Sequence, residues 1–192
     1  MNLPNKLTVL RLIMTPVFLF TLLYSFPHHY LVALVLFILA SLTDMVDGKI
    51  ARSRNLITDF GKFLDPLADK MLTTAAFLGF IQLGIGKGIV WITFIVLIRE
   101  FLITSLRLVS AGKGTVIAAN IWGKAKTVSQ MVAIIVAIFG RYLLSLGLDC
   151  VPAFQAGVAA VTDIALWISA LLTVISGVIY VMENKKYIDP KK

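Results

Sequence analysis

Six long apolar runs, separated by short polar segments, account for most of this 192-residue chain. Each run is long enough to cross a hydrocarbon core about 30 Å thick as a helix, the first one only if its flanking residues are included. The pattern therefore predicts six membrane-spanning helices. They cover residues 12–26, 31–50, 65–83, 89–109, 121–146 and 158–182.

The segments outside the runs predict the remaining secondary structure. Residues 2–8, with Pro4 at a first-turn position, predict a short helix along the membrane surface ahead of the first span. Pro16 predicts a kink in that span. The connections are expected at residues 25–30, 52–60, 84–88 and 110–120, the third of them a tight glycine-rich turn.

Composition places the chain among membrane proteins. It is 59% hydrophobic and 15% charged, with a mean hydropathy of +0.92, values that exclude an ordinary soluble domain. Because no linker or internal repeat interrupts it, residues 1–192 are predicted to form one all-α, polytopic membrane domain. No cleavable signal peptide is evident. The single cysteine, Cys150, excludes an intrachain disulfide and leaves the redox compartment open.

The basic residues predict the orientation of the helices. With both termini in the cytoplasm, only Lys87 and Arg141 fall on the opposite side, and Arg99 falls within a span. Positive charge gathers in this way on cytoplasmic segments, so the net charge of +8 indicates membrane topology rather than nucleic-acid binding. The cytoplasmic basic residues are Lys6, Arg11, Lys49, Arg52, Arg54, Lys62, Lys70, Arg107, Lys113, Lys124, Lys126, Lys185, Lys186, Lys191 and Lys192.

Four aspartates form two pairs on either side of the 52–60 connection. Asp44 and Asp47 are three residues apart, and Asp65 and Asp69 are four apart, so each pair shares one face of its own helix. A short connection would bring the two pairs together. Carboxylates that converge in this way need compensation, and hard cations such as Mg²⁺ or Mn²⁺ suit all-oxygen ligands. The alternative is a set of solvated acids at helix ends.

The spacing D-x2-D-G-x2-A-R-x8-G-x3-D-x3-D over residues 44–69 resembles the signature of the CDP-alcohol phosphotransferases. These membrane enzymes join a CDP-linked lipid or alcohol to a hydroxyl acceptor and release CMP. The resemblance implies that Asp69 is the general base, and that the other three aspartates, with Asp69 shared, hold two metal ions on the diphosphate. It also implies a pocket for the cytidine and diphosphate, lined by Gly48, Ala51, Arg52 and Gly61.

Each of these implied roles has a structural alternative. The glycines can serve close helix packing, and Arg52 can be a topology anchor. Direct in-line displacement with metal assistance is expected, without a covalent enzyme intermediate. The only histidines, His28 and His29, are predicted on the opposite side of the membrane, and no cysteine lies near the aspartates.

Further charged residues occur in and beside the fourth and fifth runs. Arg99 and Glu100 lie within a span, which makes them functional candidates; mutual neutralisation or a subunit contact is the alternative. Lys124 and Lys126 open the fifth run, where the helix dipole disfavours cations. They indicate either an anionic ligand or membrane anchors.

Segments flanking the signature narrow the resemblance to bacterial family members that use sn-glycerol 3-phosphate as acceptor and CDP-diacylglycerol as donor. These segments are residues 2–8, 59–70, 98–101 and 123–127. An acceptor that carries a phosphate needs a second basic pocket, for which Arg107, Lys124 and Lys126 are the candidates. The resemblance also implies a homodimer in the bacterial cell membrane, among membrane lipids, with its active site at the cytoplasmic face.

Two alternatives differ in function. The acceptor can instead be an inositol phosphate or phosphatidylglycerol, with the same chemistry. A divalent-cation transporter is a different class, since acids at a membrane border also suit ion transit. The other predicted spans contain only Glu100 and Asp163 as acids, so the sequence offers no acidic path across the bilayer.

Overall fold

The computed structural model describes residues 3–53, 59–112 and 121–185, with side chains described in 5–43, 67–68, 70–112 and 121–185. Within these ranges the regular structure is entirely helical, which confirms the all-α prediction. A short 3₁₀ helix, η1 (Leu148–Cys150), precedes the last helix. The α-helices are α1 (Leu3–Leu23), α2 (His29–Ser53), α3 (Asp59–Leu83), α4 (Ile89–Gly112), α5 (Ile121–Ser145) and α6 (Pro152–Glu183).

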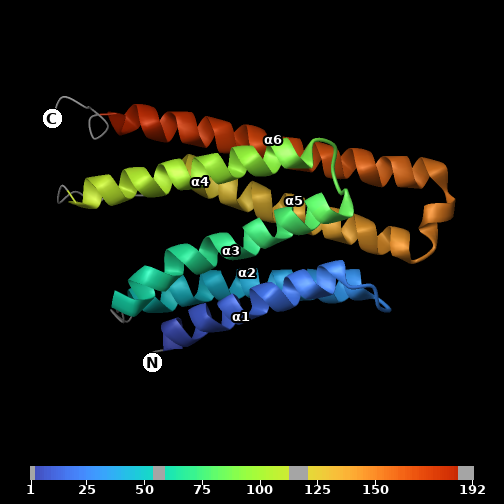
Figure 1. Ribbon diagram of the computed structural model, residues 1–192, viewed down its shortest axis with the longest axis horizontal. Helices are drawn as coiled ribbons and strands as arrows, with labels where there is room; N and C mark the ends of the chain where they lie inside the picture. Colours follow the sequence, from blue (N-terminus) through green and yellow to red (C-terminus); the bar gives the residue numbers. More distant parts are fainter. Residues whose placement is uncertain (1–2, 54–58, 113–120, 186–192) are drawn as a thin grey trace.

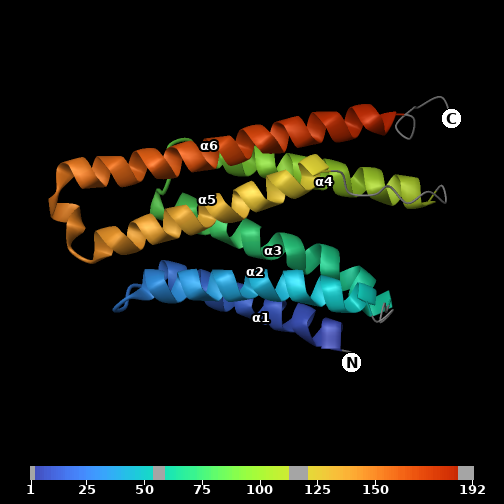
Figure 2. The ribbon, with the colours of Figure 1, turned by 180° about the vertical axis from the view of Figure 1, so that it is seen from behind.

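The helices run alternately up and down the long axis of the molecule (Figures 1 and 2). α1 packs against α2 and α3, and α6 packs against α4 and α5; contacts of α2 with α5 and of α3 with α4 join the two groups. The start of α1, the end of α2, the start of α3, the end of α4 and the end of α6 all lie on the left of Figure 1. We call this end of the bundle the site end and the opposite end the far end.

Four helical segments are long and apolar enough to cross a membrane, among the residues that the structure describes. They are Asn5–Leu23, Ile89–Gly112, Ile121–Ser145 and Pro152–Glu183. The described apolar parts of α2 and α3 are shorter, His29–Thr43 and Lys70–Leu83. These two helices have 25 residues each, about 37 Å at the α-helical rise. Six spans therefore remain a prediction, of which four are supported.

An apolar core extends through the middle of the bundle. Phe18 of α1 meets Phe37 of α2 with ring centroids 5.5 Å apart, and Phe77 and Phe80 of α3 are fully buried beside them. Many large apolar side chains point outward instead, among them Trp91, Phe101 and Ile121. An apolar exterior around a bundle whose backbone bonds are satisfied within helices is what a lipid environment requires.

The predicted Gly84–Gly88 turn between α3 and α4 is confirmed. Gly84, Gly86 and Gly88 adopt φ values of 63°, 91° and 73°, a region that favours glycine because it has no Cβ. Trp167 of α6 closes over this turn and donates its indole N–H to the Lys87 carbonyl at 3.1 Å.

The N-terminal lead is not a separate surface helix, so that prediction was wrong. α1 runs without interruption from Leu3 to Leu23 and contains Pro16. Asn5, Thr8 and Arg11 are at most 6% exposed. They recur every three residues and so share one face of α1, which packs against α2 and α3. This polar face therefore packs within the bundle, and residues 3–8 form the first turns of α1.

Two other boundaries also differ from the predictions. The 52–60 connection is shorter than expected, because α2 continues to Ser53 and α3 begins at Asp59. α6 begins at Pro152, six residues before the predicted start, with proline at a first-turn position where its missing N–H costs nothing.

We predict that Gly140→Leu destabilises the bundle. A Cβ at Gly140 of α5 would lie 2.7 Å from Val158 Cγ1 of α6. Val158 has little freedom to rotate away, because its side chain is β-branched and lies in a helix. Overpacking of this kind costs about 1–3 kcal/mol. The thermal unfolding midpoint in detergent should fall by several degrees.

Gly157→Leu is the matched control for this change, because a Cβ there has no other atom within 4 Å. Its midpoint should stay near that of the wild type. If the two variants have the same midpoint, the close approach of α5 and α6 at Gly140 does not exist.

Candidate active site

The four aspartates of the signature lie on neighbouring antiparallel helices, at matching distances from the connection between them. Asp47 is six residues before the end of α2 and Asp65 is six residues after the start of α3. Asp44 is nine residues from its helix end and Asp69 is ten. At 1.5 Å per residue, the two acids of each helix lie about 9 Å and about 14–15 Å from the helix end that is nearer the α2–α3 connection. The backbone thus pairs the acids at two depths at the site end.

The side chains of these aspartates lie outside the described residues, and so do those of the predicted nucleotide-pocket residues Gly48, Ala51, Arg52 and Gly61. Among the side chains that are described, no group of three or more His, Cys, Asp or Glu residues can hold a metal ion. The donor set of the aspartates fits Mg²⁺ or Mn²⁺ by its chemistry, because it consists of carboxylate oxygens only. Their backbone positions at matching depths are compatible with one shared site.

The polar face of α1 is a part of this region that the sequence interpretation missed. Asn5, Thr8 and Arg11 are buried where α1 contacts the two helices that carry the aspartates. Their three-residue spacing ahead of an apolar run was the available signal, since a polar stripe of that period marks one helix face. Arg11 is thus a buried cation at the site end rather than a surface anchor.

Glu100 of α4 is the centre of a charged cluster that joins three helices. Its Oε1 accepts hydrogen bonds from Lys126 Nζ of α5 and, at 3.3 Å, from Nη1 of the neighbouring Arg99. Lys70 Nζ of α3 lies 3.7 Å from its Oε2. The Glu100 side chain is 16% exposed and that of Lys126 only 6%. The predicted neutralisation of Arg99 by Glu100 is therefore present, but two lysines from other helices share the carboxylate.

Lys70 fixes the register between α3 and α4 directly after Asp69. Besides the Glu100 carboxylate, its ammonium group contacts the Thr104 hydroxyl and lies 3.5 Å from the Glu100 carbonyl oxygen. All three contacts are on one turn of α4. The backbone position of Asp69 is consequently tied to α4 through the residue that follows it.

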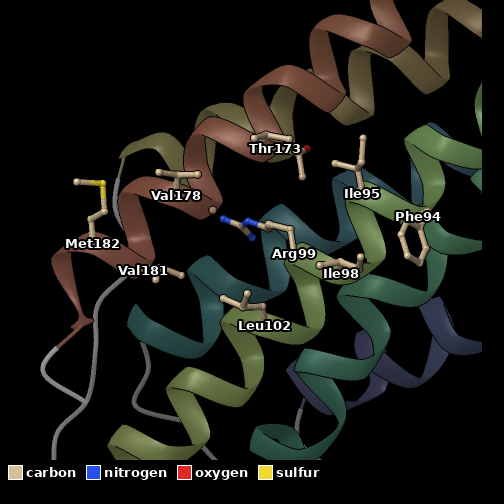
Figure 3. A pocket seen from close by; sticks show the side chains of 11 residues that line it. Phe94, Ile95, Ile98, Arg99, Leu102, Thr173, Val178, Val181 and Met182 are labelled. Atoms are coloured by element: carbon tan, nitrogen blue, oxygen red, sulfur yellow. The ribbon is translucent and has the colours of Figure 1, made fainter. Parts of the chain in front are cut away.

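Arg99 extends from α4 towards α6 and forms part of an apolar groove between these two helices (Figure 3). Its Nη2 donates to Ser176 Oγ at 2.7 Å. Gly177 permits this approach, because a Cβ there would lie 3.1 Å from Arg99 Cγ. The groove has a volume of about 440 Å³, and Phe94 and Val178 are among its apolar lining. Through Arg99, the Glu100 cluster also reaches α6.

The three residues predicted to bind the acceptor phosphate have different neighbours. Arg107 Nε of α4 donates to the Tyr180 hydroxyl of α6 at 3.0 Å, and its guanidinium lies 5.5 Å from the Tyr180 ring centroid. Lys126 contacts Glu100, as described above. Lys124 is exposed on the first turn of α5. The structure therefore places all three at the site end of α4 and α5.

Other charged groups lie away from this region. Lys87 is in the α3–α4 turn at the far end, where its backbone N–H donates to Asp163 Oδ1 of α6 at 2.8 Å. Arg141 is near the far end of α5, and His28 is in the α1–α2 turn. Closer to the Glu100 cluster, the uncharged Gln130, one turn along α5 from Lys126, is buried and donates to Thr173 Oγ1 of α6 at 3.2 Å. The contacts of Lys87 and Gln130 connect helices without joining the Glu100 cluster.

Comparisons of the sequence with known proteins found a matching family model and several relatives. A family model described as CDP-alcohol phosphatidyltransferase matches residues 1–175. The CDP-diacylglycerol–glycerol-3-phosphate 3-phosphatidyltransferase of Bacillus subtilis (strain 168) is 40% identical over 195 residues, covering 95% of each chain. A probable phosphatidylglycerophosphate synthase of Mycobacterium tuberculosis (strain ATCC 25618 / H37Rv) is 44% identical over 183 residues, which are 94% of this chain and 80% of that protein.

A third relative comes from Rickettsia bellii (strain RML369-C). It carries the same name as the Bacillus protein and is 37% identical over 186 residues, covering 97% of each chain. The family model spans the signature aspartates, the Glu100 cluster and the first turns of α5 together. This chain belongs to the CDP-alcohol phosphatidyltransferase family.

Proposed function

We propose that this protein transfers the phosphatidyl group of CDP-diacylglycerol to sn-glycerol 3-phosphate, forming phosphatidylglycerophosphate and CMP. The observation that carries the proposal is the position of the two aspartate pairs, at matching depths on α2 and α3, within the signature of the family. The names of the Bacillus and Rickettsia relatives support the choice of both substrates, and the name of the Mycobacterium relative supports the product.

The donor side of the site is assigned to α2 and the start of α3. Gly48, Ala51 and Gly61 leave room for the cytidine and diphosphate to approach the backbone, and Arg52 offers a planar fork to a phosphate oxygen. Asp44, Asp47 and Asp65, with Asp69 shared, would hold two Mg²⁺ or Mn²⁺ ions. When bound, such ions offset the negative charge of the diphosphate and stabilise the oxygen that leaves.

Asp69 is assigned as the general base that takes the proton of the acceptor hydroxyl. It lies about one turn deeper along α3 than Asp65. The activated oxygen then attacks phosphorus in line with the departing CMP, so no covalent bond to the protein forms. The described side chains at the site end include no cysteine or histidine that could act as a nucleophile instead.

The acceptor side of the site is assigned to α4 and α5. Glycerol 3-phosphate is close to a dianion at neutral pH, and Arg107, Lys124 and Lys126 are the cations at the site end that would hold its phosphate. The distribution of basic residues supports placing this end at the cytoplasmic face of a bacterial cell membrane. A homodimer surrounded by membrane lipids completes the proposal.

The acceptor is tested by measuring CMP release from CDP-diacylglycerol by the purified protein in detergent with Mg²⁺. Glycerol 3-phosphate should be used with a kcat/KM at least about a hundredfold higher than inositol phosphate or phosphatidylglycerol, because the pocket matches one phosphorylated acceptor. A higher kcat/KM for either of the others would reassign the acceptor. CMP release that none of the three stimulates would refute the proposed reaction.

We predict that Asp69→Asn abolishes turnover while CDP-diacylglycerol binding is largely retained, because the proton acceptor is lost while the other three aspartates remain to hold the metal ions. Asp44→Asn and Asp65→Asn should instead lose activity together with metal affinity. CMP release, combined with a titration of Mn²⁺ binding, separates the two effects. If excess Mg²⁺ or Mn²⁺ rescues Asp69→Asn but neither of the other variants, the roles are reversed.

We also predict that Arg107→Gln or Lys126→Gln raises the KM for glycerol 3-phosphate. Losing a charge-assisted contact costs about 1.5–3 kcal/mol, which is about tenfold to a hundredfold in kcat/KM. The KM for CDP-diacylglycerol should change much less. Lys87→Gln, at the far end, is the matched control and should leave both KM values unchanged.

The outcome distinguishes binding from folding. Equal losses of kcat/KM for both substrates would indicate that Arg107 and Lys126 support the fold and do not bind the acceptor specifically. Unchanged kinetics in both variants would show that neither residue binds the acceptor.

A further inference from the structure

Glu100 occupies a central position that the proposed reaction does not yet use. Its carboxylate contacts Lys126 of α5, Arg99 of α4 and Lys70 of α3. Lys126 is assigned to the acceptor phosphate, and Lys70 directly follows the assigned base, Asp69. Glu100 is therefore the described side chain that links the acceptor side of the site to the base.

We infer that Glu100 is a positioning residue for the acceptor, which holds Lys126 and Lys70 against α4 and thereby fixes the acceptor phosphate relative to Asp69. The inference rests on the proposed function, because it presupposes a phosphorylated acceptor held at Lys126. Glu100 itself does not touch the reacting atoms in this role.

The need for such a residue follows from the chemistry of lysine. A lysine ammonium is a compact charge on a flexible four-carbon stem, so it specifies the place of a phosphate poorly unless something else holds it. The Lys126 side chain is 6% exposed and donates to Glu100 Oε1. An acceptor that binds at Lys126 consequently meets a preorganised cation and does not have to order one.

The contact of Glu100 with Lys70 affects the position of the assigned base, Asp69. Lys70 places its ammonium group between the Thr104 hydroxyl, the Glu100 carbonyl oxygen at 3.5 Å and the Glu100 carboxylate at 3.7 Å. These contacts hold the turn of α3 that contains Asp69 against one turn of α4. A shift of about 1 Å between acceptor and base is enough to lower the rate about a hundredfold.

A purely structural role for Glu100 is the competing explanation. Arg99 already pairs with Glu100 at 3.3 Å and with Ser176 at 2.7 Å, so the cluster also connects α4 with α6. If that connection were its whole purpose, losing the carboxylate would weaken the fold and affect both substrates equally. A positioning role predicts a loss confined to the acceptor.

The first test is Glu100→Gln, measured by CMP release with each substrate varied in turn. The kcat/KM for glycerol 3-phosphate should fall about tenfold to a hundredfold, by analogy with the removal of an outer partner that orients a metal ligand. The KM for CDP-diacylglycerol should change less than about threefold. Equal losses for the two substrates, or no loss for the acceptor, would overturn the inference.

A double-mutant cycle shows whether Glu100 acts through Lys126. In a Lys126→Gln protein, adding Glu100→Gln should lower kcat/KM for the acceptor by clearly less than in the wild type, because only the contact of Glu100 with Lys70 is left to lose. If Glu100→Gln costs as much in this background as in the wild type, Glu100 does not act through Lys126 and the inference fails.

Two further variants guard against a failure to fold. Glu100→Asp keeps the charge but withdraws the carboxylate by one methylene; it should fold and show a smaller loss than Gln, again confined to glycerol 3-phosphate. Asp163→Asn removes a carboxylate that also joins two segments, α6 and the α3–α4 turn, but at the far end. It should leave both KM values unchanged.

The wild-type protein keeps the two proposals separable. Suppose that it releases CMP with glycerol 3-phosphate, but Glu100→Asp lowers kcat/KM equally for glycerol 3-phosphate and CDP-diacylglycerol. Then only the positioning role is wrong. If the wild type does not use glycerol 3-phosphate at all, the proposed function itself fails, whatever the Glu100 variants do.

Discussion

A carboxylate inside an apolar helix bundle must be paired, and this constraint organises the half of the molecule to which we assign the site. Glu100 lies within a candidate span and meets Lys126, Arg99 and Lys70 there. Removing one partner of a buried ion pair typically costs about 3–5 kcal/mol. α3, α4 and α5 are therefore held in one arrangement at the site end, and Arg99 extends the constraint to α6 through Ser176.

The arrangement brings two chemically different regions to the same end of the bundle. α2 and α3 contribute carboxylates in a family signature, while α4 and α5 contribute cations. Such a division suits a transfer between a metal-held diphosphate and a phosphorylated acceptor, because each substrate needs its own counter-charge. The two regions are in direct contact, because Lys70, which follows Asp69, lies 3.7 Å from the carboxylate of Glu100 on α4.

Local patterns in the sequence predicted much of this and failed where contacts are long-range. The helical spacing of Asp44, Asp47, Asp65 and Asp69 follows from a periodicity of 3.6 residues, and the glycine turn at residues 84–88 from its composition. The pairing of Glu100 with Lys126 could not be predicted, since spacing places each residue on a face of its own helix but does not say which helix lies opposite. The buried polar face of α1 was missed for the same reason.

The central claim is that both substrates are held at the site end at once, so that the acceptor hydroxyl displaces CMP in a single step. The most direct test is the stereochemical course of the reaction, measured with CDP-diacylglycerol made chiral by isotopic or sulfur substitution at the phosphorus that is attacked. One in-line displacement predicts inversion at that phosphorus. Retention would require two displacements through a covalent intermediate and would contradict the account.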